Sequence, residues 1–481
     1  MNVDLLISGS SVLASQNKTF QRLNPYNNEV ASVVAAGSPE DAIAVVRAAH
    51  GAFPAWSAKG PHERRKLLLK AADLMEQRSG DFIAATTEET GATGPWGSFN
   101  VAVAAKMLRE AASMTTQITG EIIPSEKPGS MAMAVRQAVG VCVGIAPWNA
   151  PVILGTRAIA TPLACGNTVV LKASEMCPRT HRMIGEVLND AGIPAGVVNV
   201  ITNAPEDAAR VVEALVRAPE VKRVNFTGST RVGRIIAKLC AEELKPCLLE
   251  LGGKAPFIVL DDADVEAAVN GAAFGAFMNM GQICMSTERI IVVESIADQF
   301  TKALAEKADK LPAGDPNGPN VLGALVSLEA ALKMDAIIAD ALDKGAKIVA
   351  GGRRNGAVVE ATVLDHVTPA MRIYSEESFG PVKPIIRVKD VEEAVAIAND
   401  TEYGLAASLY TNDVTAGLRI AARIKSGICH INGPTVADEP QMPFGGVKEL
   451  GWGRFGGKAA ISEFTDLRWI TIEDPKQGYP F

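Results

Sequence analysis

Residues 221–237 read Val-Lys-Arg-Val-Asn-Phe-Thr-Gly-Ser-Thr-Arg-Val-Gly-Arg-Ile-Ile-Ala. The run up to Phe226 predicts a strand, Gly228 predicts a tight turn, and the residues after Ser229 predict a helix. Strand, glycine turn and helix in this order form the repeating unit of a parallel α/β sheet. Because the first N–H groups of such a helix favour an anion, this turn is a candidate site for the pyrophosphate of a dinucleotide. The glycine spacing matches neither standard nucleotide-binding pattern, so an ordinary turn without a ligand remains the alternative.

Short apolar runs alternate with helical segments on both sides of this unit, which indicates βαβ units and a parallel sheet. The first series of expected strands is Val139–Ala146, Thr168–Lys172, Val197–Ile201, Val221–Phe226, Leu248–Glu250 and Phe257–Val259. Upstream, Ser38-Pro39-Glu40-Asp41 is a typical helix start, and amphipathic helices are expected from there to about residue 115.

A second series of the same kind follows Asp261. Helices are expected at Val265–Met280 and Ser295–Lys310, with strands at Arg289–Glu294, Ala346–Ala350, Val382–Val388, Ala407–Tyr410 and Gly427–Ile431. The predicted fold class is therefore α/β, with two doubly wound parallel-sheet domains. Residues 117–137 and the tail from Leu467 alternate polar and apolar side chains and are expected to form a small β-flap between subunits.

Composition and charge argue against several classes of protein. With 481 residues, 48% hydrophobic and 21% charged, the chain has room for two or three domains with full cores. A net charge of −7 argues against nonspecific nucleic-acid binding. The apolar stretch from Val139 to Leu171 contains Arg157 and three prolines, which argues against a membrane span. The first residues lack the pattern of a signal peptide, and a cytoplasmic location is predicted.

One of the seven cysteines stands apart in the sequence. The cysteines form no C-x-x-C pair and the five histidines are scattered, so no metal site is expected. Cys284 lies in Phe277-Met-Asn-Met-Gly-Gln-Ile-Cys284-Met-Ser and is expected at the end of a small-residue helix. A lone thiol in this setting fits a nucleophile, although a buried core cysteine explains the local sequence equally well.

A nucleotide site also needs a partner for the ribose. The segment Leu171-Lys172-Ala173-Ser174-Glu175 ends a predicted strand. A carboxylate at Glu175 would accept hydrogen bonds from ribose hydroxyls and repel a 2′-phosphate, which favours NAD over NADP. The alternative is a solvated lysine and glutamate pair at a helix start.

Six segments together resemble the aldehyde dehydrogenase superfamily, in that family's order and along nearly the whole chain. They are Ala146-Pro147-Trp148-Asn149, Phe226-Thr-Gly228-Ser229-Thr-x-x-Gly233, Glu250-Leu-Gly-Gly-Lys254, Gly281-Gln-x-Cys284, Glu377-Ser-Phe379-Gly380-Pro381 and Pro443-Phe444-Gly445-Gly446. One departure is Ala173, where the family often has proline. This change loosens the ribose loop and leaves Lys172 and Glu175 in place.

The resemblance implies a role for each of these segments. Cys284 would be the nucleophile and Glu250 the general base, with Asn149 and the Cys284 backbone N–H as oxyanion donors. NAD would be held by Ile145, Ala146, Pro147, Trp148, Lys172, Ser174, Glu175, Phe226, Gly228, Ser229, Val232, Gly233, Leu251, Glu377 and Phe379. Trp148 and Val232 are equally explained as core residues, and Lys254 would support or cap the turn after Glu250.

The resemblance also implies a division of the chain and an assembly. Residues 1–117 and 139–250, with a return at 451–466, would form the NAD-binding domain, and residues 251–450 the catalytic domain. The flap would comprise 118–138 and 467–481, and the protein would be a homodimer or tetramer.

The chemistry calls for these residue types independently. A bare aldehyde is a poor hydride donor, so a thiolate must first add to the carbonyl and form a thiohemiacetal. Its oxyanion needs preorganised donors, and its collapse with loss of hydride leaves a thioester. Glu250 would then activate water to release the acid, since burial raises a glutamate pKa toward neutrality. The alternative for Glu250 is a charged residue that closes a strand before a glycine turn.

The helix expected after Asn149 carries the signal for the substrate. Asn149, Ile153 and Arg157 share one helix face, so Arg157 points toward the substrate. A guanidinium in so apolar a helix needs a partner, either a polar group of the substrate or a carboxylate such as Asp438. Small Ala150 leaves room for a flat ring, and the expected apolar walls, each otherwise an ordinary core residue, are Trp96, Ile283, Met285 and Phe444.

The string from Pro147 to Arg157 resembles the branch of the family that oxidises salicylaldehyde and vanillin. It implies an aromatic aldehyde as the small-molecule substrate, with salicylaldehyde first and benzaldehyde or vanillin as alternatives. A cysteine-dependent acyl hydrolase would need a paired histidine that the sequence does not mark. A CoA-acylating enzyme is disfavoured by Glu250, and a non-enzymatic role by the presence of both Cys284 and Glu250.

Overall fold

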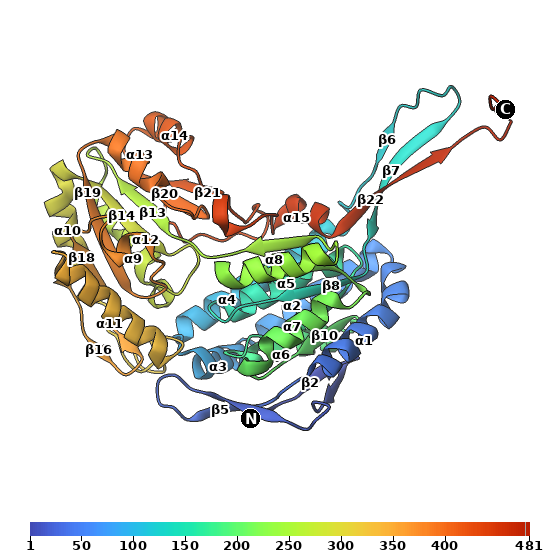
Figure 1. The fold of residues 1–481 in the computed structure, drawn as a ribbon, viewed down its shortest axis with the longest axis horizontal. Helices are drawn as coiled ribbons and strands as arrows, with labels where there is room; N and C mark the ends of the chain where they lie inside the picture. Colours follow the sequence, from blue (N-terminus) through green and yellow to red (C-terminus); the bar gives the residue numbers. More distant parts are fainter. Residues whose placement is uncertain (477) are drawn as a thin grey trace.

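The computed structural model describes residues 1–476 and 478–481, and it shows two α/β halves with a narrow sheet projecting from one of them (Figure 1). The main strands of the first half are β2 (Leu5–Ile7), β3 (Ser10–Val12), β8 (Val141–Ile145), β9 (Thr168–Lys172), β10 (Val198–Ile201), β11 (Val221–Thr227) and β12 (Cys247–Glu250). They form a seven-stranded sheet of order β12-β11-β8-β9-β10-β2-β3. Neighbours from β12 to β10 run parallel, and the β2–β3 hairpin adds an antiparallel edge.

Helices flank this sheet, and a small sheet lies at the N-terminus. The helices are α1 (Pro39–Ser57), α2 (Pro61–Gln77), α3 (Ser79–Thr90), α4 (Gly94–Met114), α5 (Pro151–Ala164), α6 (Pro178–Asp190), η1 (Pro205–Asp207), α7 (Ala208–Arg217) and α8 (Thr230–Glu242). The small sheet contains β1 (Asn2–Val3), β4 (Thr19–Leu23) and β5 (Val30–Ala35). Ser38 and Asp41 form a reciprocal capping box at the start of α1, as the sequence predicts.

The strand order reverses beside β8. From β8 the chain passes through α5 to β9 on one side, whereas β11 pairs with β8 on the other. The registers Ile145↔Lys172, Phe226↔Ile145 and Thr227↔Glu250 bring the carboxyl ends of four strands to one edge of the sheet. Because the connections leave in opposite directions at such a reversal, a ligand crevice opens there.

The second half is built on another seven-stranded sheet, of order β15-β18-β19-β14-β13-β20-β21, in which only the β15 pairing is antiparallel. Its strands are β13 (Ala255–Val259), β14 (Thr287–Val293), β15 (Lys347–Ala350), β18 (Thr362–Asp365), β19 (Val382–Val388), β20 (Ala406–Tyr410) and β21 (Ile428–Ile431), beside the hairpin β16 (Arg354–Asn355) and β17 (Val358–Val359). Its helices are α9 (Val265–Phe277), η2 (Met278–Gly281), α10 (Glu294–Ala308), α11 (Leu328–Asp343), α12 (Arg372–Ser375), α13 (Val391–Asn399) and α14 (Val414–Ala421). The chain then passes through η3 (Lys448–Leu450) and returns to the first half in α15 (Gly457–Glu463).

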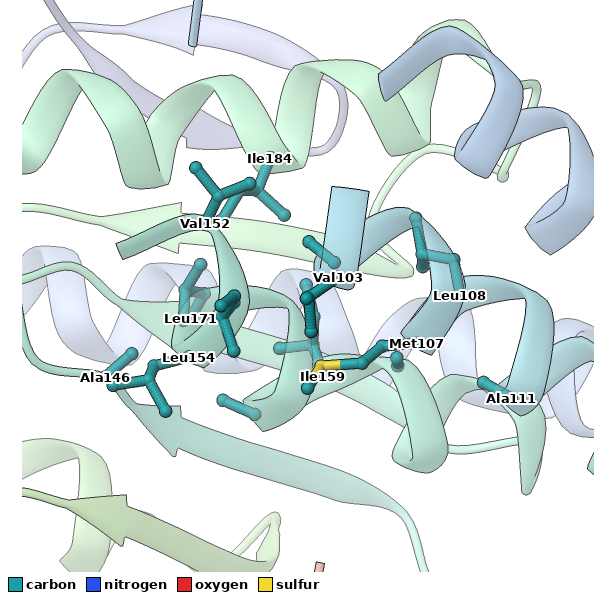
Figure 2. Packing of buried hydrophobic residues seen from close by; sticks show 14 of the residues in the cluster. Val103, Met107, Leu108, Ala111, Ala146, Val152, Leu154, Ile159, Leu171 and Ile184 are labelled. Carbon is teal, nitrogen blue, oxygen red and sulfur yellow. The ribbon is translucent and has the colours of Figure 1, made fainter. Parts of the chain in front are cut away.

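Helix α5 lies at the centre of the first core. All 14 of its residues are buried, as expected for a helix that is apolar on most sides. Figure 2 shows Val152, Leu154 and Ile159 of α5 among side chains of α4 such as Val103 and Met107. Within the described residues, no helix combines the length and apolar character needed to cross a membrane.

The projecting sheet contains β6 (Glu121–Ile123), β7 (Met131–Ala138) and β22 (Thr465–Ile472), all paired antiparallel (Figure 1). Both segments expected in the flap therefore pair with each other, although β22 begins at Thr465. Residue 477, which belongs to the predicted flap tail, lies outside the described residues. Large apolar side chains on this sheet are exposed, including Ile122, Leu467 and Trp469.

Three predictions about elements are wrong. The strand expected at Phe257–Val259 in the first series is β13, which pairs with β14 and β20 in the second sheet. The helix expected to reach Met280 ends at Phe277, and Cys284 follows the short η2 turn instead of ending a helix. Asn279 and Met280 have φ values of 47° and 55°, which an α-helix cannot contain. Strand β18, the β16–β17 hairpin and the strands before residue 36 were not predicted; all but β4 and β5 have four residues or fewer, too few to show a clear periodicity.

Candidate active site

A strained turn presents Cys284. Asn279, Met280 and Gly281 all have positive φ, and a side chain on Gly281 would lie 2.3 Å from the Gly380 carbonyl oxygen. Two non-glycine residues in this conformation cost free energy, and such strain is concentrated at functional sites. The turn leaves Cys284 partly exposed between two cavities, both of which it lines.

Glu250 ends β12 beside Cys284. Its side chain is buried, and neither carboxylate oxygen has a geometric hydrogen-bond partner among the described residues. Burial raises the pKa of Glu250 to about 7, against the opposing effects of the Arg157 guanidinium and the Cys284 thiol. An unpaired buried carboxylate with a pKa near neutrality is suited to accept a proton from water or from a thiol.

The thiol of Cys284 is neutral in this state. Burial raises its pKa well above its ordinary value, and the Glu250 carboxylate raises it further, because a thiolate there would face a like charge. Glu250 is thus the nearby base that can take the thiol proton when Cys284 reacts.

Asn149 is held by three hydrogen bonds. Its side-chain Nδ2 donates to the Gln282 carbonyl at 3.0 Å. Its own backbone carbonyl accepts from Trp96 Nε1 at 3.0 Å and from Asn279 Nδ2 at 2.9 Å. An asparagine amide has two N–H groups, so one remains for an oxyanion beside Cys284. Sequence reasoning did not assign these supporting roles to Trp96, Asn279 and Gln282.

The first cavity opens at the sheet edge beside β8 and has a volume of about 230 Å³. Its wall contains the predicted residues Pro147, Trp148, Asn149, Gly228, Ser229, Glu250, Leu251, Cys284, Glu377 and Phe379, together with Thr227 and Gly252. Trp148 and Phe379 meet edge to face at 5.7 Å. Ser229 caps α8, so the first N–H groups of that helix lie next to this wall.

Close backbone packing shapes this cavity. A side chain on Gly252 would lie 3.0 Å from Glu377 Oε2, and one on Gly253 would lie 2.1 Å from the Cys284 carbonyl oxygen. The Gly253 N–H donates to Glu377 Oε1 at 2.8 Å. Burial raises the pKa of Glu377 to about 7, against this hydrogen bond. The glycine pair therefore lets the base strand, the nucleophile turn and Glu377 converge.

The predicted ribose residues form a separate, largely buried group. Lys172 at the end of β9 forms an ion pair with Glu175, which also accepts from Asn203 Nδ2 at 2.9 Å. Burial opposes ionisation of Glu175, yet the adjacent Lys172 ammonium lowers its pKa. The alternative interpretation, a solvated lysine and glutamate pair at the surface, does not fit, since Lys172 is buried and Glu175 is mostly buried.

The remaining predicted cofactor residues lie at the same sheet edge but outside the wall of the first cavity. Ile145 ends β8, Phe226 lies in β11, Val232 and Gly233 are in the first turns of α8, and Ala146 and Ser174 follow β8 and β9. A side chain on Gly233 would lie 2.4 Å from Leu251, so this glycine permits close helix packing.

A second cavity of about 150 Å³ lies on the other side of Cys284. All seven predicted substrate residues line it, namely Trp96, Ala150, Ile153, Arg157, Ile283, Met285 and Phe444. The residues that sequence reasoning did not assign to it are Phe99, Leu154, Phe274, Met278, Val436, Ala437 and Asp438. Phe99 follows Trp96 by one helical turn, so the helical periodicity of the sequence places both on one face and could have identified Phe99. The loop 436–438 has no periodicity that could have identified its residues.

Arg157 has a protein carboxylate as its partner. Its Nη2 lies 2.5 Å from Asp438 Oδ2, and its guanidinium carbon is 4.1 Å from the centre of the Phe444 ring. Both side chains of the ion pair are more than nine-tenths buried. Of the two partners expected for Arg157, the structure therefore shows Asp438.

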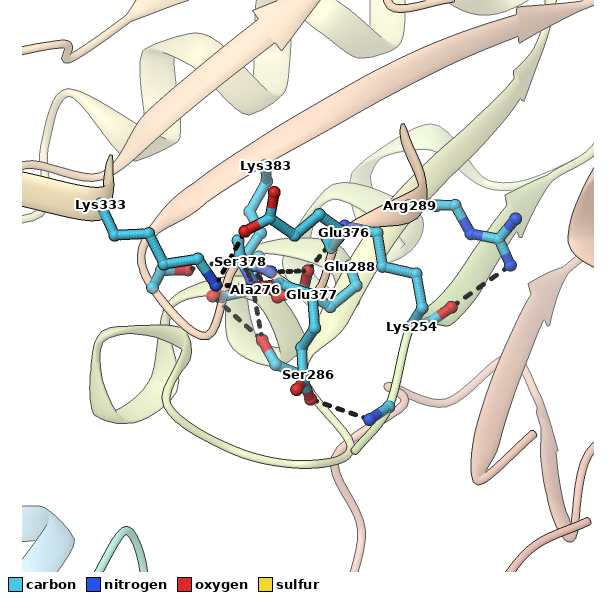
Figure 3. Close-up of polar contacts among 12 residues, drawn as sticks. Lys254, Ala276, Ser286, Glu288, Arg289, Lys333, Glu376, Glu377, Ser378 and Lys383 are labelled. Carbon is cyan, nitrogen blue, oxygen red and sulfur yellow. Dashed lines mark hydrogen bonds and ion pairs between the residues drawn. The ribbon is translucent and has the colours of Figure 1, made fainter. Parts of the chain in front are cut away.

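A buried ionic network lies behind the loop that carries Glu377 (Figure 3). Glu288 of β14 accepts from Lys254 at 2.8 Å, from Lys383 at 2.7 Å and from the backbone and hydroxyl of Ser378. Burial opposes ionisation of Glu288, but the two ammonium groups lower its pKa to about 2. Burial lowers the pKa of Lys254 to about 8 despite Glu288. Lys254 therefore supports this network, which anchors Ser378 between Glu377 and Phe379.

No group of three or more potential metal-ligating side chains occurs within the part of the chain that the structure describes. The geometry supports nucleophilic chemistry. A thiol, a neighbouring base and an amide donor meet where an aromatic-lined cavity joins a crevice at the end of a parallel sheet.

Comparisons with known proteins agree with this geometry. A sequence model of the aldehyde dehydrogenase family matches residues 12–470, and the chain belongs to that family of enzymes. It is 59% identical to a vanillin dehydrogenase of Pseudomonas fluorescens, with 100% of both chains covered. The crystal structure of a salicylaldehyde dehydrogenase from Pseudomonas putida G7 complexed with salicylaldehyde is 49% identical, with a TM-score of 0.98 and 100% of both chains covered. The structure of PnpE in complex with nicotinamide adenine dinucleotide is 36% identical, with a TM-score of 0.96 and coverage of 100% of this chain and 99% of that one.

Proposed function

We propose that this enzyme oxidises hydroxylated aromatic aldehydes to the corresponding acids with NAD. One observation carries the proposal: Cys284 and Asn149 line both cavities, so an aldehyde in the aromatic-lined cavity would meet the thiol and the amide beside the crevice at the sheet edge. An apolar cavity of about 150 Å³ in another protein holds benzene, so a ring of this size fits the second cavity.

Vanillin is the preferred substrate in this proposal, and salicylaldehyde is the second candidate. The sequence pattern alone favoured salicylaldehyde. Identity is 59% to the vanillin dehydrogenase and 49% to the salicylaldehyde dehydrogenase, which supports the reverse order. Both substrates present one flat ring and one aldehyde, which suits the aromatic and apolar lining of the cavity.

The residues of the first cavity fit a dinucleotide. Gly252 and Gly253 remove side chains that would collide with Glu377 and the nucleophile turn, and α8 offers its positive end to a phosphate. Glu175 at the neighbouring strand end would accept hydrogen bonds from the ribose hydroxyls and repel a 2′-phosphate, which favours NAD over NADP. The bound cofactor would supply a hydride acceptor.

In the first half of the reaction, Glu250 takes the proton of the Cys284 thiol and the sulfur adds to the aldehyde carbon. The Asn149 amide and the Cys284 backbone N–H donate to the oxyanion of the resulting thiohemiacetal. Loss of hydride from this carbon re-forms the carbonyl as a thioester. The Cys284 sulfur, the nucleophile in this half of the reaction, is the leaving group in the next half.

In the second half, water must attack the thioester. Glu250, once it has lost its proton to solvent, accepts a proton from that water, and the acid and the Cys284 thiol are released. The burial that raises the pKa of Glu250 makes it a stronger base than an exposed glutamate.

The assembly and the division into domains complete the proposal. We assign residues 1–117, 139–250 and 451–466 to the cofactor domain, 251–450 to the catalytic domain, and 118–138 with 467–481 to an oligomerisation flap. Exposed Ile122 and Trp469 on the projecting sheet support a dimer or tetramer, because a free sheet edge with apolar residues favours pairing with another chain.

A substrate panel tests the function. Purified enzyme is given aliphatic, unsubstituted aromatic and hydroxylated aromatic aldehydes with NAD or NADP, and NADH or NADPH and the acid product are measured. The expected result is the highest kcat/KM for vanillin with NAD, and none for Cys284→Ala. No reduced cofactor with any aromatic aldehyde would overturn the proposal.

A further inference from the structure

The Asp438 carboxylate is only half satisfied. Oδ2 pairs with Arg157, whereas Oδ1 is buried without a hydrogen-bond partner among the described residues. Leaving such an oxygen unpaired costs free energy, so a donor is expected from a group that enters the site. Asp438 lines the 150 Å³ cavity together with Cys284, so the missing donor can come from the substrate.

We propose that Asp438 determines substrate specificity, with Oδ1 accepting a hydrogen bond from the hydroxyl at the ring position opposite the aldehyde. This inference rests on the proposed function, and it assigns to Asp438 the recognition that the sequence suggested for Arg157. The guanidinium compensates the charge of the carboxylate and is held over Phe444, so it positions Asp438.

The position of Arg157 on α5 determines which hydroxyl of the substrate ring can reach Asp438. Asn149 lies just before α5 and outside its helical geometry, so the two residues do not share a helix face as the sequence predicted. Arg157 lies six residues after Pro151, the first residue of α5, and so about 9 Å along the helix axis from that end. A substrate carbonyl at Cys284 and Asn149 therefore directs the opposite end of its ring toward the Arg157–Asp438 pair. A hydroxyl next to the aldehyde, as in salicylaldehyde, stays near Cys284 and does not reach the carboxylate.

A competing explanation is a water molecule. A cavity of about 20 Å³ also borders Arg157 and Asp438, and this volume holds one water. If such a water satisfies Oδ1, the substrate hydroxyl gains nothing from Asp438. The two explanations differ in whether the preference for hydroxylated rings depends on this residue.

The test compares 4-hydroxybenzaldehyde with 4-fluorobenzaldehyde, which has nearly the same shape and lacks the donor. The measured quantity is the ratio of their kcat/KM values with NAD, in which effects on the common chemical steps cancel between variants. Asp438→Leu combined with Arg157→Leu is expected to lower this ratio about 10- to 100-fold relative to wild type, the effect of losing a hydrogen bond to a charged group. The double substitution removes both buried charges together, because a single one would leave an unpaired ion.

A second variant, Asp438→Asn, tests whether residue 438 acts as a hydrogen-bond acceptor. Its amide oxygen can keep the contact with Arg157, which turns the amide nitrogen, a donor, toward the ring. We expect 4-methoxybenzaldehyde, which only accepts, to gain relative to 4-hydroxybenzaldehyde. The matched control is Glu439→Gln, an exposed neighbour, for which the wild-type ratio is expected.

Thermal unfolding establishes that each variant is folded. If the variants do not fold, calorimetric binding of 4-hydroxybenzyl alcohol and 4-fluorobenzyl alcohol to the wild type decides instead, with at least tenfold tighter binding expected for the hydroxyl compound. Equal binding, or unchanged rate ratios in folded variants, overturns the inference. If the wild type forms NADH from both aldehydes in that case, the proposed function stands. If it forms NADH from neither, the proposed function itself fails.

Discussion

At the scale of single residues, the site depends on two neighbouring ionisable groups, the Cys284 thiol and the Glu250 carboxyl. Neither oxygen of this carboxyl has a hydrogen-bond partner among the described residues. Burial raises the pKa of both the Cys284 thiol and the Glu250 carboxyl. The Glu250 carboxylate raises the pKa of the thiol further, whereas the thiol lowers the pKa of Glu250. The pair therefore holds two protons below about pH 7 and one proton, on the thiol, above it. Such an arrangement keeps the nucleophile unreactive until an electrophile arrives and keeps a base beside it.

This arrangement predicts a pH dependence for product release. The raised pKa of Glu250, about 7, means that the carboxyl is protonated below pH 7 and cannot accept a proton from water. Turnover limited by thioester hydrolysis should therefore fall about tenfold per pH unit below about 7 and level off above it. Steady-state kcat from pH 5 to 9 measures this. A midpoint near the ordinary glutamate pKa would contradict the assignment, and Glu250→Gln should lose the midpoint altogether.

The residues that the sequence predicts for the site lie together in the structure, but most of the residues that support them were not predicted. Cys284, Glu250 and Asn149 are marked by glycines and by a strand end, and all seven predicted substrate residues line one cavity. Asp438 lies in a loop without periodicity, and its partner is 281 residues away in the chain. The sequence offers Asp438 only as one of two possible partners of Arg157, because the choice between them depends on how the two halves pack together.

At the scale of elements, the loop between α12 and β19 is placed by three buried charges, which lie in β14, in β19 and just before β13. Glu288 in β14 binds Lys254, Lys383 and Ser378, and Ser378 separates the two residues expected to contact the cofactor. Glu288 gives no signal in the sequence, since it lies just before the predicted strand Arg289–Glu294, where a charge usually points to solvent. The sequence likewise predicts α9 but not its end at Phe277. The apolar, small-residue pattern continues past Phe277 and does not indicate the left-handed conformation of Asn279 and Met280.

The network makes a specific prediction. Glu288→Gln leaves two buried ammonium groups without their counter-charge, and we expect a loss of about 3–5 kcal/mol in unfolding free energy. Because the loop of Glu377 loosens, KM for NAD should rise more than KM for the aldehyde. Urea unfolding and initial rates measure both effects.

The control for this prediction is Glu213→Gln, which removes one carboxylate from an exposed ion pair with Arg217 and should change little. Equal small effects of the two substitutions would show that the buried network does not hold the loop.

At the scale of the whole molecule, two parallel sheets bring their functional edges together, and the chain returns across the first half to form the projecting sheet (Figure 1). The alternation of strands and helices predicts both sheets. It does not predict the short N-terminal strands, and it does not show how the halves face each other. That relation depends on buried contacts distant in sequence.

The projecting sheet predicts an oligomer. Trp469→Glu together with Ile122→Lys places charges on exposed apolar positions of the flap, and light scattering should show a shift to a smaller species. Leu244→Glu, on an exposed residue outside the flap, is the matched control. A wild-type mass for the flap variant, or a monomeric wild type, would show that this sheet is not the interface.

The covalent intermediate tests the central claim most directly. Glu250→Gln enzyme is mixed with vanillin and NAD, and its intact mass and the NADH formed are measured together. The account predicts that one acyl group accumulates on Cys284, located by peptide mapping, with about one NADH per active subunit and very slow turnover afterwards. The acyl group should form more slowly than in the wild type, because Glu250 no longer takes the thiol proton. NADH formation at the wild-type rate without an adduct on Cys284 would contradict the account.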